Sequence, residues 1–166
     1  MGDFCHYPLI QHIITSRQLL EEFLNYICNF QSQNALVKTS VNIKGDSRVG
    51  FSLLSHYAKN PNVKALRIET AYLDKDCLNI LYVLLNSNPN LTIELTTDEK
   101  NSKDALNENS SQIEQLKATG RFELKLVPKT HIKSYEIEFK DGKKIHISGS
   151  WNCQKTNSKQ EFTISI

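Results

Sequence analysis

Apolar residues recur along this chain with two periods, one typical of helices and one typical of strands, and the two kinds of segment alternate. The clearest helical segment begins with a capping box at Thr15–Gln18 and carries one apolar face as far as Phe30. A strand-like alternation runs from Val37 to Ile43. The pattern then predicts a helix over 48–59, a strand over 63–70, a helix over 75–86 capped by Asp74, and a strand over 91–96.

The ends and the middle of the chain are less regular. Residues 1–14 are mixed and predict an irregular or short helical lead-in. Residues 97–112 are rich in charged and small polar residues, so at least part of them is expected to be a mobile surface loop. A helix then reaches Thr119, with Gly120 as its C-terminal cap. Strands are predicted over 122–127 and 161–166, with a β-hairpin between them.

This order of elements predicts an α/β fold, a mixed β-sheet flanked by helices on both faces. The 166 residues suit a single domain, 1–166, with a core over 35–166 and an N-terminal helical extension over 1–34. The extension either packs as an extra helix or extends a subunit interface. No internal repeat is visible.

The hairpin between residues 131 and 152 carries the candidate chemistry. His131 and Lys133 are two residues apart, so on a strand both side chains leave the same face. Asp141-Gly142 is a strong two-residue turn signal. The return strand ends in Gly149–Asn152, in which Ser150 and Asn152 again share a face. An imidazole, an ammonium, a hydroxyl and a carboxamide directed to one point suit a phosphate group.

The pattern His131-Ile132-Lys133, then a hairpin, then Gly149-Ser150-Trp151-Asn152 resembles the signature of the phospholipase D superfamily. Glu161 stands near the position where the family keeps a carboxylate. Two features depart from the family pattern. Glu138 occupies the position of the motif's Asp, and the spacing from Lys133 to Gly149 is longer than usual; Asp141 can be taken as the displaced Asp. The longer hairpin, with Tyr135 two residues after the Lys, resembles the single-motif nuclease branch. The alternative is a coincidental surface hairpin.

The resemblance implies a metal-independent phosphodiesterase with an α/β sandwich fold. His131 would attack phosphorus to form a covalent phosphohistidine, and Lys133, Ser150 and Asn152 would bind the non-bridging oxygens. A carboxylate would orient the imidazole, with Glu161 as the first choice and Glu138 as the second.

A second histidine must protonate the leaving oxygen, yet only one His-x-Lys is present. His6, His12 and His56 have no such context. His146 can share a strand face with Ser150 and contact substrate, although an ordinary solvated strand position is the favoured explanation. The family's short members dimerise to form one composite site, so a homodimer is expected.

Three function classes remain open: a nuclease acting on DNA or RNA, a lipid-directed phosphodiesterase or phosphatidyl transferase, and a nucleic-acid-binding module with weakened catalysis. The nuclease is favoured, because the lipid enzymes would bring two motifs in a longer chain. Residues 121–166 hold nine Lys/Arg against five Asp/Glu, although the whole chain has a net charge of only +2. This local excess modestly favours an anionic substrate.

The remaining sequence features mostly argue against other kinds of site. Gly45 and Gly50 have the spacing of a phosphate-binding loop, but Phe51 stands where its Lys is needed, so no nucleotide site is expected. The four cysteines lack paired spacing, which predicts reduced thiols in a cytoplasmic protein and no zinc site. No signal peptide, membrane partner, metal or other cofactor is expected.

Overall fold

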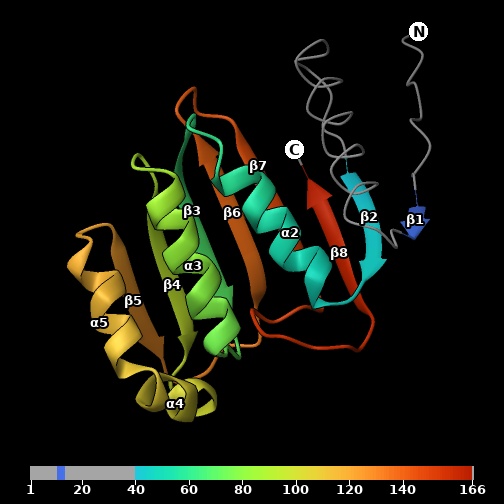
Figure 1. Cartoon of the computed structure of the whole chain (residues 1–166). Helices are drawn as coiled ribbons and strands as arrows, with labels where there is room; N and C mark the ends of the chain where they lie inside the picture. The colour runs from blue at the N-terminus through green and yellow to red at the C-terminus, as the bar shows by residue number, and fades with distance from the viewer. Residues whose placement is uncertain (1–10, 14–39, 166) are drawn as a thin grey trace, which may run out of the picture.

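The computed structural model of this protein describes residues 11–13 and 40–165, which form one mixed β-sheet with four helices (Figure 1). The strands are β1 (Gln11–Ile13), β2 (Ser40–Gly45), β3 (Val63–Thr70), β4 (Thr92–Asp98), β5 (Phe122–Val127), β6 (Lys133–Phe139), β7 (Lys144–Gly149) and β8 (Gln160–Ser165). The helices are α2 (Ser47–Ala58), α3 (Lys75–Ser87), α4 (Glu99–Glu108) and α5 (Ser110–Ala118).

The strand order across the sheet is β1-β2-β8-β7-β6-β3-β4-β5. Strands β3, β4 and β5 run parallel, and their connections contain α3, α4 and α5. The hairpin β6–β7 is antiparallel and joins the parallel half through the antiparallel pair β3–β6. The late hairpin therefore lies in the middle of the sheet, and its first strand, β6, begins beside the carboxyl end of β3.

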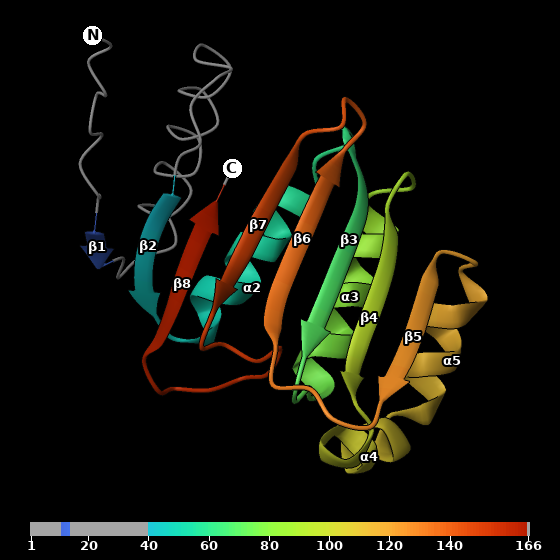
Figure 2. The ribbon, with the colours of Figure 1, turned by 180° about the vertical axis from the view of Figure 1, so that it is seen from behind.

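Helices α2, α3 and α5 cover one face of the sheet, as the front and back views show (Figures 1 and 2). Their apolar sides form the core with alternate residues of the strands. The fully buried core side chains include Leu53, Leu54, Leu66, Ile68, Leu78, Leu81, Tyr135 and Phe162. Helix α4 lies at one end of the sheet, beside the carboxyl ends of β4 and β5.

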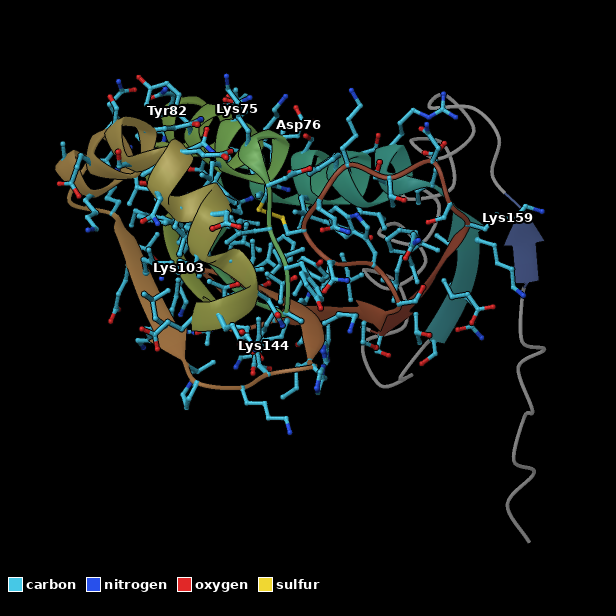
Figure 3. All side chains as sticks on the ribbon, turned by 90° about the horizontal axis from the view of Figure 1, so that it is seen from below. Lys75, Asp76, Tyr82, Lys103, Lys144 and Lys159 are labelled. Atoms are coloured by element: carbon cyan, nitrogen blue, oxygen red, sulfur yellow. A yellow bond between two sulfur atoms is a disulfide. The ribbon has the colours of Figure 1, made fainter. Side chains whose placement is uncertain are left out.

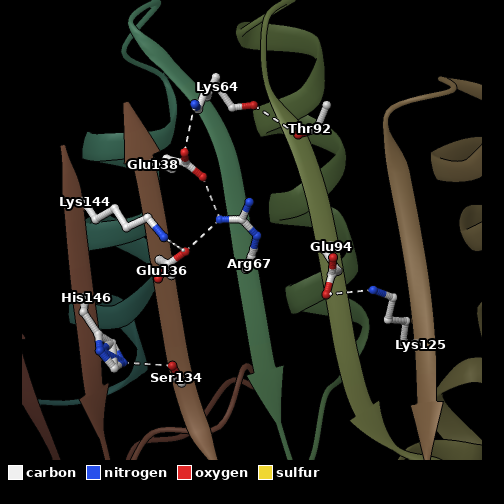
Figure 4. Close-up of polar contacts among 10 residues, drawn as sticks. All are labelled: Lys64, Arg67, Thr92, Glu94, Lys125, Ser134, Glu136, Glu138, Lys144 and His146. Carbon is white, nitrogen blue, oxygen red and sulfur yellow. Dashed lines mark hydrogen bonds and ion pairs between the residues drawn. The ribbon is translucent and has the colours of Figure 1, made fainter. Parts of the chain in front are cut away.

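The other sheet face is polar within the described ranges. Arg67 on β3 donates to Glu136 and Glu138 on β6, and Lys144 on β7 also pairs with Glu136 (Figure 4). These ion pairs are partly exposed, so each contributes little to stability on its own. Helices on this second face, which the sequence analysis expected, are not found among the described residues.

Most predicted elements are confirmed within one to three residues at their ends. Strand β3 has the predicted bounds, and the Asp74 carboxylate caps α3 by accepting from the Cys77 N–H at 2.9 Å. The predicted hairpin turns at Asp141-Gly142, where Gly142 has a φ of 87°. The mixed α/β fold predicted from the sequence is therefore correct.

Three expectations differ from the structure. The segment 97–112, expected to be at least partly a loop, instead contains α4 and the start of α5. The lead-in contains a short strand, β1, parallel to β2. The helix predicted over 15–30, and with it most of the proposed 1–34 extension, lies outside the described residues.

The expectation of reduced thiols is wrong for one pair of cysteines. Cys77 at the start of α3 and Cys153 after β7 form a disulfide, with their Cα atoms 5.4 Å apart. Their separation of 76 residues explains why spacing along the chain did not predict the pair. Cys5 and Cys28 lie outside the described residues. No helix between residues 40 and 165 combines the length and apolarity needed to cross a membrane.

Candidate active site

The two halves of the His-x-Lys and Gly-Ser-x-Asn pattern meet at Thr70, the last residue of β3. Lys133, the first residue of β6, is the strand partner of Thr70. The Thr70 hydroxyl oxygen lies 3.5 Å from Oδ1 of Asn152 and accepts a hydrogen bond from the Cys153 N–H at 3.1 Å. Thr70 is fully buried. The fold thus brings Lys133 and Asn152, from opposite ends of the hairpin, to the same strand end.

The Asn152 carboxamide lies beside Thr70 but forms only a weak hydrogen bond with it. The single proton of the Thr70 hydroxyl is donated to the Tyr72 carbonyl at 2.8 Å, a much better geometry than the 3.5 Å contact with Asn152. Asn152 is half-buried. Its amide group is therefore free to donate to a substrate oxygen.

His131 lies two residues before Lys133, in the segment that joins β5 to β6, and its side chain is exposed. The Lys133 ammonium folds back and donates to the His131 carbonyl at 2.9 Å. The preceding residue, Thr130, is buried and fixed by two strands: its hydroxyl donates to Glu69 on β3 at 2.8 Å, and its N–H donates to Asp98 on β4 at 3.2 Å. The exposed His131 side chain thus follows Thr130, whose backbone and side chain are both held by hydrogen bonds.

Asp98 is a carboxylate that the sequence analysis missed. It ends β4 and caps α4, where Oδ1 accepts from the Asn101 N–H at 2.8 Å while Oδ2 accepts from Thr130. Hydrogen bonds from the backbone N–H groups of Asn101 and Thr130 lower the pKa of Asp98, and a smaller contribution comes from the positive charge of His131. Asp98 is buried, so it places a fixed negative charge near His131. Its position as a helix cap was the signal available in the sequence.

Ser150 is turned toward β8 rather than toward Thr70. Its N–H donates to the Glu161 carbonyl at 3.0 Å, and its hydroxyl accepts from the Glu161 N–H at 2.9 Å and donates to Gln160 at 3.2 Å. Gly149 has a φ of +148°, and a Cβ added there would collide with the Glu161 carbonyl oxygen. Gly149 and Ser150 therefore allow the end of β7 to lie close to β8.

Trp151 anchors the turn between Ser150 and Asn152 in the core. Its ring stacks on Tyr135 at 5.0 Å between centroids, and the Tyr135 hydroxyl donates to the Trp151 carbonyl at 2.8 Å. A Cβ added to Gly50 on α2 would lie 2.5 Å from the indole, so Gly50 allows the helix to pack against this ring. The glycine that resembled part of a phosphate loop is thus a packing position.

The two carboxylates named from the sequence as partners of His131 make other contacts. Glu161 forms an ion pair with Lys44 on β2 at 2.9 Å. Glu138 pairs with Lys64 and Arg67 on the polar sheet face, and these two cations lower its pKa to about 2 (Figure 4). Glu138 is also five residues along β6 from Lys133, roughly 17 Å at the usual strand rise. Neither side chain is directed to His131 by these contacts.

His146 lies on the polar sheet face, where its Nε2 is 2.9 Å from the Ser134 hydroxyl (Figure 4). Its neighbours Ile145 and Ile147 are buried against the helices, so the His146 side chain leaves the opposite face. Lys133 is two residues before the buried Tyr135 on β6, so its side chain leaves the same face of the sheet, the one that the helices cover. His146 and Lys133 therefore belong to different faces of the sheet.

The end of the molecule that carries these residues also carries exposed lysines. Figure 3 shows this end, with Lys103 of α4 on one side and Lys159 of the loop preceding β8 on the other. Lys129 and Lys155, on the two loops nearest His131 and Asn152 in sequence, are also exposed. No three His, Cys, Asp or Glu side chains from residue 40 to residue 165 gather as a metal-ligand set.

No protein-family model and no curated protein matches this chain in sequence. A polyphosphate kinase from Porphyromonas gingivalis has a similar structure, with a TM-score of 0.61 and 13% identity, over 87% of this chain and 26% of the kinase. Yeast tyrosyl-DNA phosphodiesterase is less similar, with a TM-score of 0.40 and 14% identity over 64% of this chain and 26% of that enzyme. This chain thus spans about a quarter of either protein's length. The kinase comparison confirms the α/β fold, and at such identity it assigns no role to any residue.

Proposed function

We propose that this protein is a phosphodiesterase of the phospholipase D type, which hydrolyses DNA or RNA as an endonuclease through a phosphohistidine. The observation that carries this proposal is the meeting of Lys133 and Asn152 at Thr70, with the exposed His131 two residues before the lysine. The similar fold of a polyphosphate kinase supports an activity at phosphate groups.

In the proposed reaction, an imidazole nitrogen of His131 attacks phosphorus while the bond to the leaving oxygen breaks. The Lys133 ammonium and the Asn152 amide bind the non-bridging oxygens, whose charge rises in the transition state. Ser150 joins them if its hydroxyl rotates away from Gln160. Water then attacks the phosphohistidine and gives its proton to the group that protonated the leaving oxygen, which releases the phosphate product and regenerates neutral His131. The negative charge of Asp98 stabilises the positive charge that the His131 ring carries while it is phosphorylated.

The leaving oxygen must receive a proton, and His146, the alternative donor named from the sequence, lies on the sheet face opposite Lys133. We therefore assign the proton donor to His131 of a second copy, in a two-fold dimer with one composite site. A two-fold interface brings the same patch of both subunits together. The two imidazoles would then lie on opposite sides of one phosphorus, as in-line displacement requires.

Exposed lysines on several segments at this end of the molecule favour a polyanion as the substrate. Lys103, Lys129, Lys155 and Lys159 are all exposed, whereas Glu161 is paired with Lys44. Their spread over separate loops suits a substrate with several phosphates rather than a single phosphate ester. One observation favours a lipid substrate instead: Ile132, between His131 and Lys133, is 52% exposed.

The deciding experiment compares purified protein on supercoiled plasmid, single-stranded DNA, RNA and a fluorescent phosphatidylcholine. Endonuclease activity converts closed plasmid to nicked or linear forms, or cuts an oligonucleotide internally, and His131→Ala is the matched control for contaminating nucleases. Cleavage of phosphatidylcholine alone would replace the nuclease with a lipid phosphodiesterase. Binding of nucleic acid without cleavage of any substrate would indicate a binding module.

A further inference from the structure

The Cys77–Cys153 disulfide joins α3 to the residue that directly follows Asn152. Both cysteines are fully buried, and their Cα atoms are 5.4 Å apart. Figure 3 shows the bond beside α3, at the end of the molecule that carries the site. No other covalent link among residues 40 to 165 connects the segment after β7 to the rest of the fold.

Hydrogen bonds hold the same segment at neighbouring points. The Cys153 N–H donates to Thr70, and Cys153 forms an isolated parallel bridge with Leu73. The Asp74 carboxylate accepts from the Cys77 N–H at 2.9 Å through one oxygen and from the Lys155 N–H at 2.7 Å through the other. The start of α3 and residues 153–155 are thus fastened together as one unit.

The Asn152 side chain has no comparable attachment of its own. Its 3.5 Å contact with Thr70 is weak, so the position of the carboxamide follows from the backbone on either side of it. Trp151 fixes the preceding residue by burial, and the disulfide fixes the following residue covalently.

We propose that the Cys77–Cys153 disulfide positions the Asn152 carboxamide for the phosphate, and that the oxidised protein is the form competent in turnover. This inference rests on the phosphodiesterase function proposed above. Cys77 and Cys153 are positioning residues, because they act through Asn152 and do not touch the substrate. Breaking the bond loosens residues 153–155 and lets the carboxamide move from its place beside Thr70.

Reduction by a dithiol is the chemical step that separates the two forms. The reductant transfers two electrons and two protons, which convert the cystine to the Cys77 and Cys153 thiols while the dithiol becomes a cyclic disulfide. Because the bond is buried, a reductant reaches it only when the protein opens. The oxidised form therefore persists in mild reductant, and the reduced form is best prepared by refolding in excess dithiothreitol.

The test compares oxidised and refolded reduced protein, with thiol content verified by alkylation and intact mass. The substrate is bis(p-nitrophenyl) phosphate, and turnover is measured in wild type and in Asn152→Ala. Displacement of a transition-state donor by about 1 Å costs roughly 10² in rate, so reduction should lower wild-type kcat by about that factor. In Asn152→Ala, reduction should change kcat less than about twofold, because the group being positioned is already absent. An equal loss in both backgrounds would show a general structural role and overturn the proposal.

A second readout does not depend on turnover. The Asn152 side-chain amide signals in a ¹⁵N NMR spectrum, assigned by their loss in Asn152→Ala, should shift or broaden on reduction, and their response to inorganic phosphate should weaken. Cys77→Ala, checked for folding by circular dichroism, should reproduce the reduced spectrum. Unchanged signals, or free thiols in protein exposed to oxidant, would overturn the proposal. If the oxidised protein hydrolyses no phosphodiester but the signals change, the proposed function fails while the positioning role stands.

Discussion

The Asp98 carboxylate accepts a hydrogen bond from the Thr130 N–H at 3.2 Å, and Thr130 is the residue directly before His131. The same carboxylate caps α4. One buried side chain therefore connects the start of a helix to the segment that presents the proposed nucleophile.

Asp98→Asn should retain the helix cap through its one carbonyl oxygen, because Asn and Asp cap helices about equally well. It removes the negative charge near His131 and leaves the Thr130 N–H without its acceptor. We expect kcat to fall by about 10-fold, the effect of roughly 1.4 kcal/mol on the transition state. Full activity in this variant would remove Asp98 from the site. Glu94→Gln, on the same strand and paired with Lys125 at the surface, is the matched control.

The pKa of Asp98 also predicts a pH dependence of stability. Because its pKa is lowered in the folded state, Asp98 contributes stability above the pKa of the unfolded chain, and this contribution is lost as pH falls through the folded pKa. Thermal unfolding measured from pH 6 to pH 3 should show a smaller decrease in Tm for Asp98→Asn than for wild type. Parallel curves for the two proteins would contradict this account.

His131→Ala should abolish turnover and leave substrate binding largely intact, since it removes the attacking nitrogen and none of the phosphate-binding groups. Asn152→Ala should lower kcat by roughly 10²–10³, as the loss of one transition-state donor does. Single-turnover rates and binding by fluorescence anisotropy separate the two effects. Substantial turnover by His131→Ala would mean that the nucleophile is assigned wrongly.

Cleavage should persist in excess EDTA, because the proposed mechanism gives the stabilisation of phosphate charge to Lys133 and Asn152 rather than to a bound cation. The assay needs protein dialysed against chelator and substrate freed of divalent ions. Activity that disappears in EDTA and returns with magnesium or manganese would rule out the phosphohistidine mechanism as stated.

Glu138→Gln should reduce stability without lowering kcat, because Glu138 pairs with Lys64 and Arg67 on the polar sheet face. Its lowered pKa, about 2, means that these ion pairs stabilise the fold above the carboxyl's unfolded pKa and are lost between about pH 4.5 and pH 2. Urea unfolding at pH 7 and pH 3 measures the difference. A large loss of kcat with unchanged stability would return Glu138 to the catalytic set.

The composite site predicts how activity falls when subunits are mixed. If wild type and His131→Ala exchange freely at equal amounts, roughly a quarter of the dimers carry two intact histidines, and only these should turn over at full rate. Independent sites would leave about half the activity. Full activity in a monomer, identified by light scattering, would exclude the composite site.

The parts of the fold that apolar periodicity describes were predictable from the sequence. Strand β3 and helix α3 bury regular apolar residues, and both were predicted closely. Helix α4 was missed because Ser102 is its buried residue, so no apolar period marks it. What identifies α4 is the Asp98 cap and the 2.6 Å contact between the Thr97 and Ser102 hydroxyls, which are polar features that an apolar period does not reveal.

The candidate site was only partly predictable, for a related reason. The motif named Lys133 and Asn152, whose meeting at Thr70 follows from a hairpin that local sequence can indicate. A local hairpin pattern does not determine which carboxylate lies near the site. Glu161 and Glu138 were chosen by position along the chain, but cations on neighbouring strands hold both of them, and Asp98 comes from a different strand altogether.

Trp151 is the only tryptophan of the chain, and it lies between Ser150 and Asn152 with its ring packed on Gly50 and Tyr135. The tryptophan fluorescence of this protein therefore comes from one indole, which is buried next to the proposed site. Its emission maximum and lifetime should report movement of this turn directly, without any attached dye. Ligand binding, subunit association or refolding can thus be followed at this turn, provided that the excitation wavelength lies beyond the absorption of the six tyrosines.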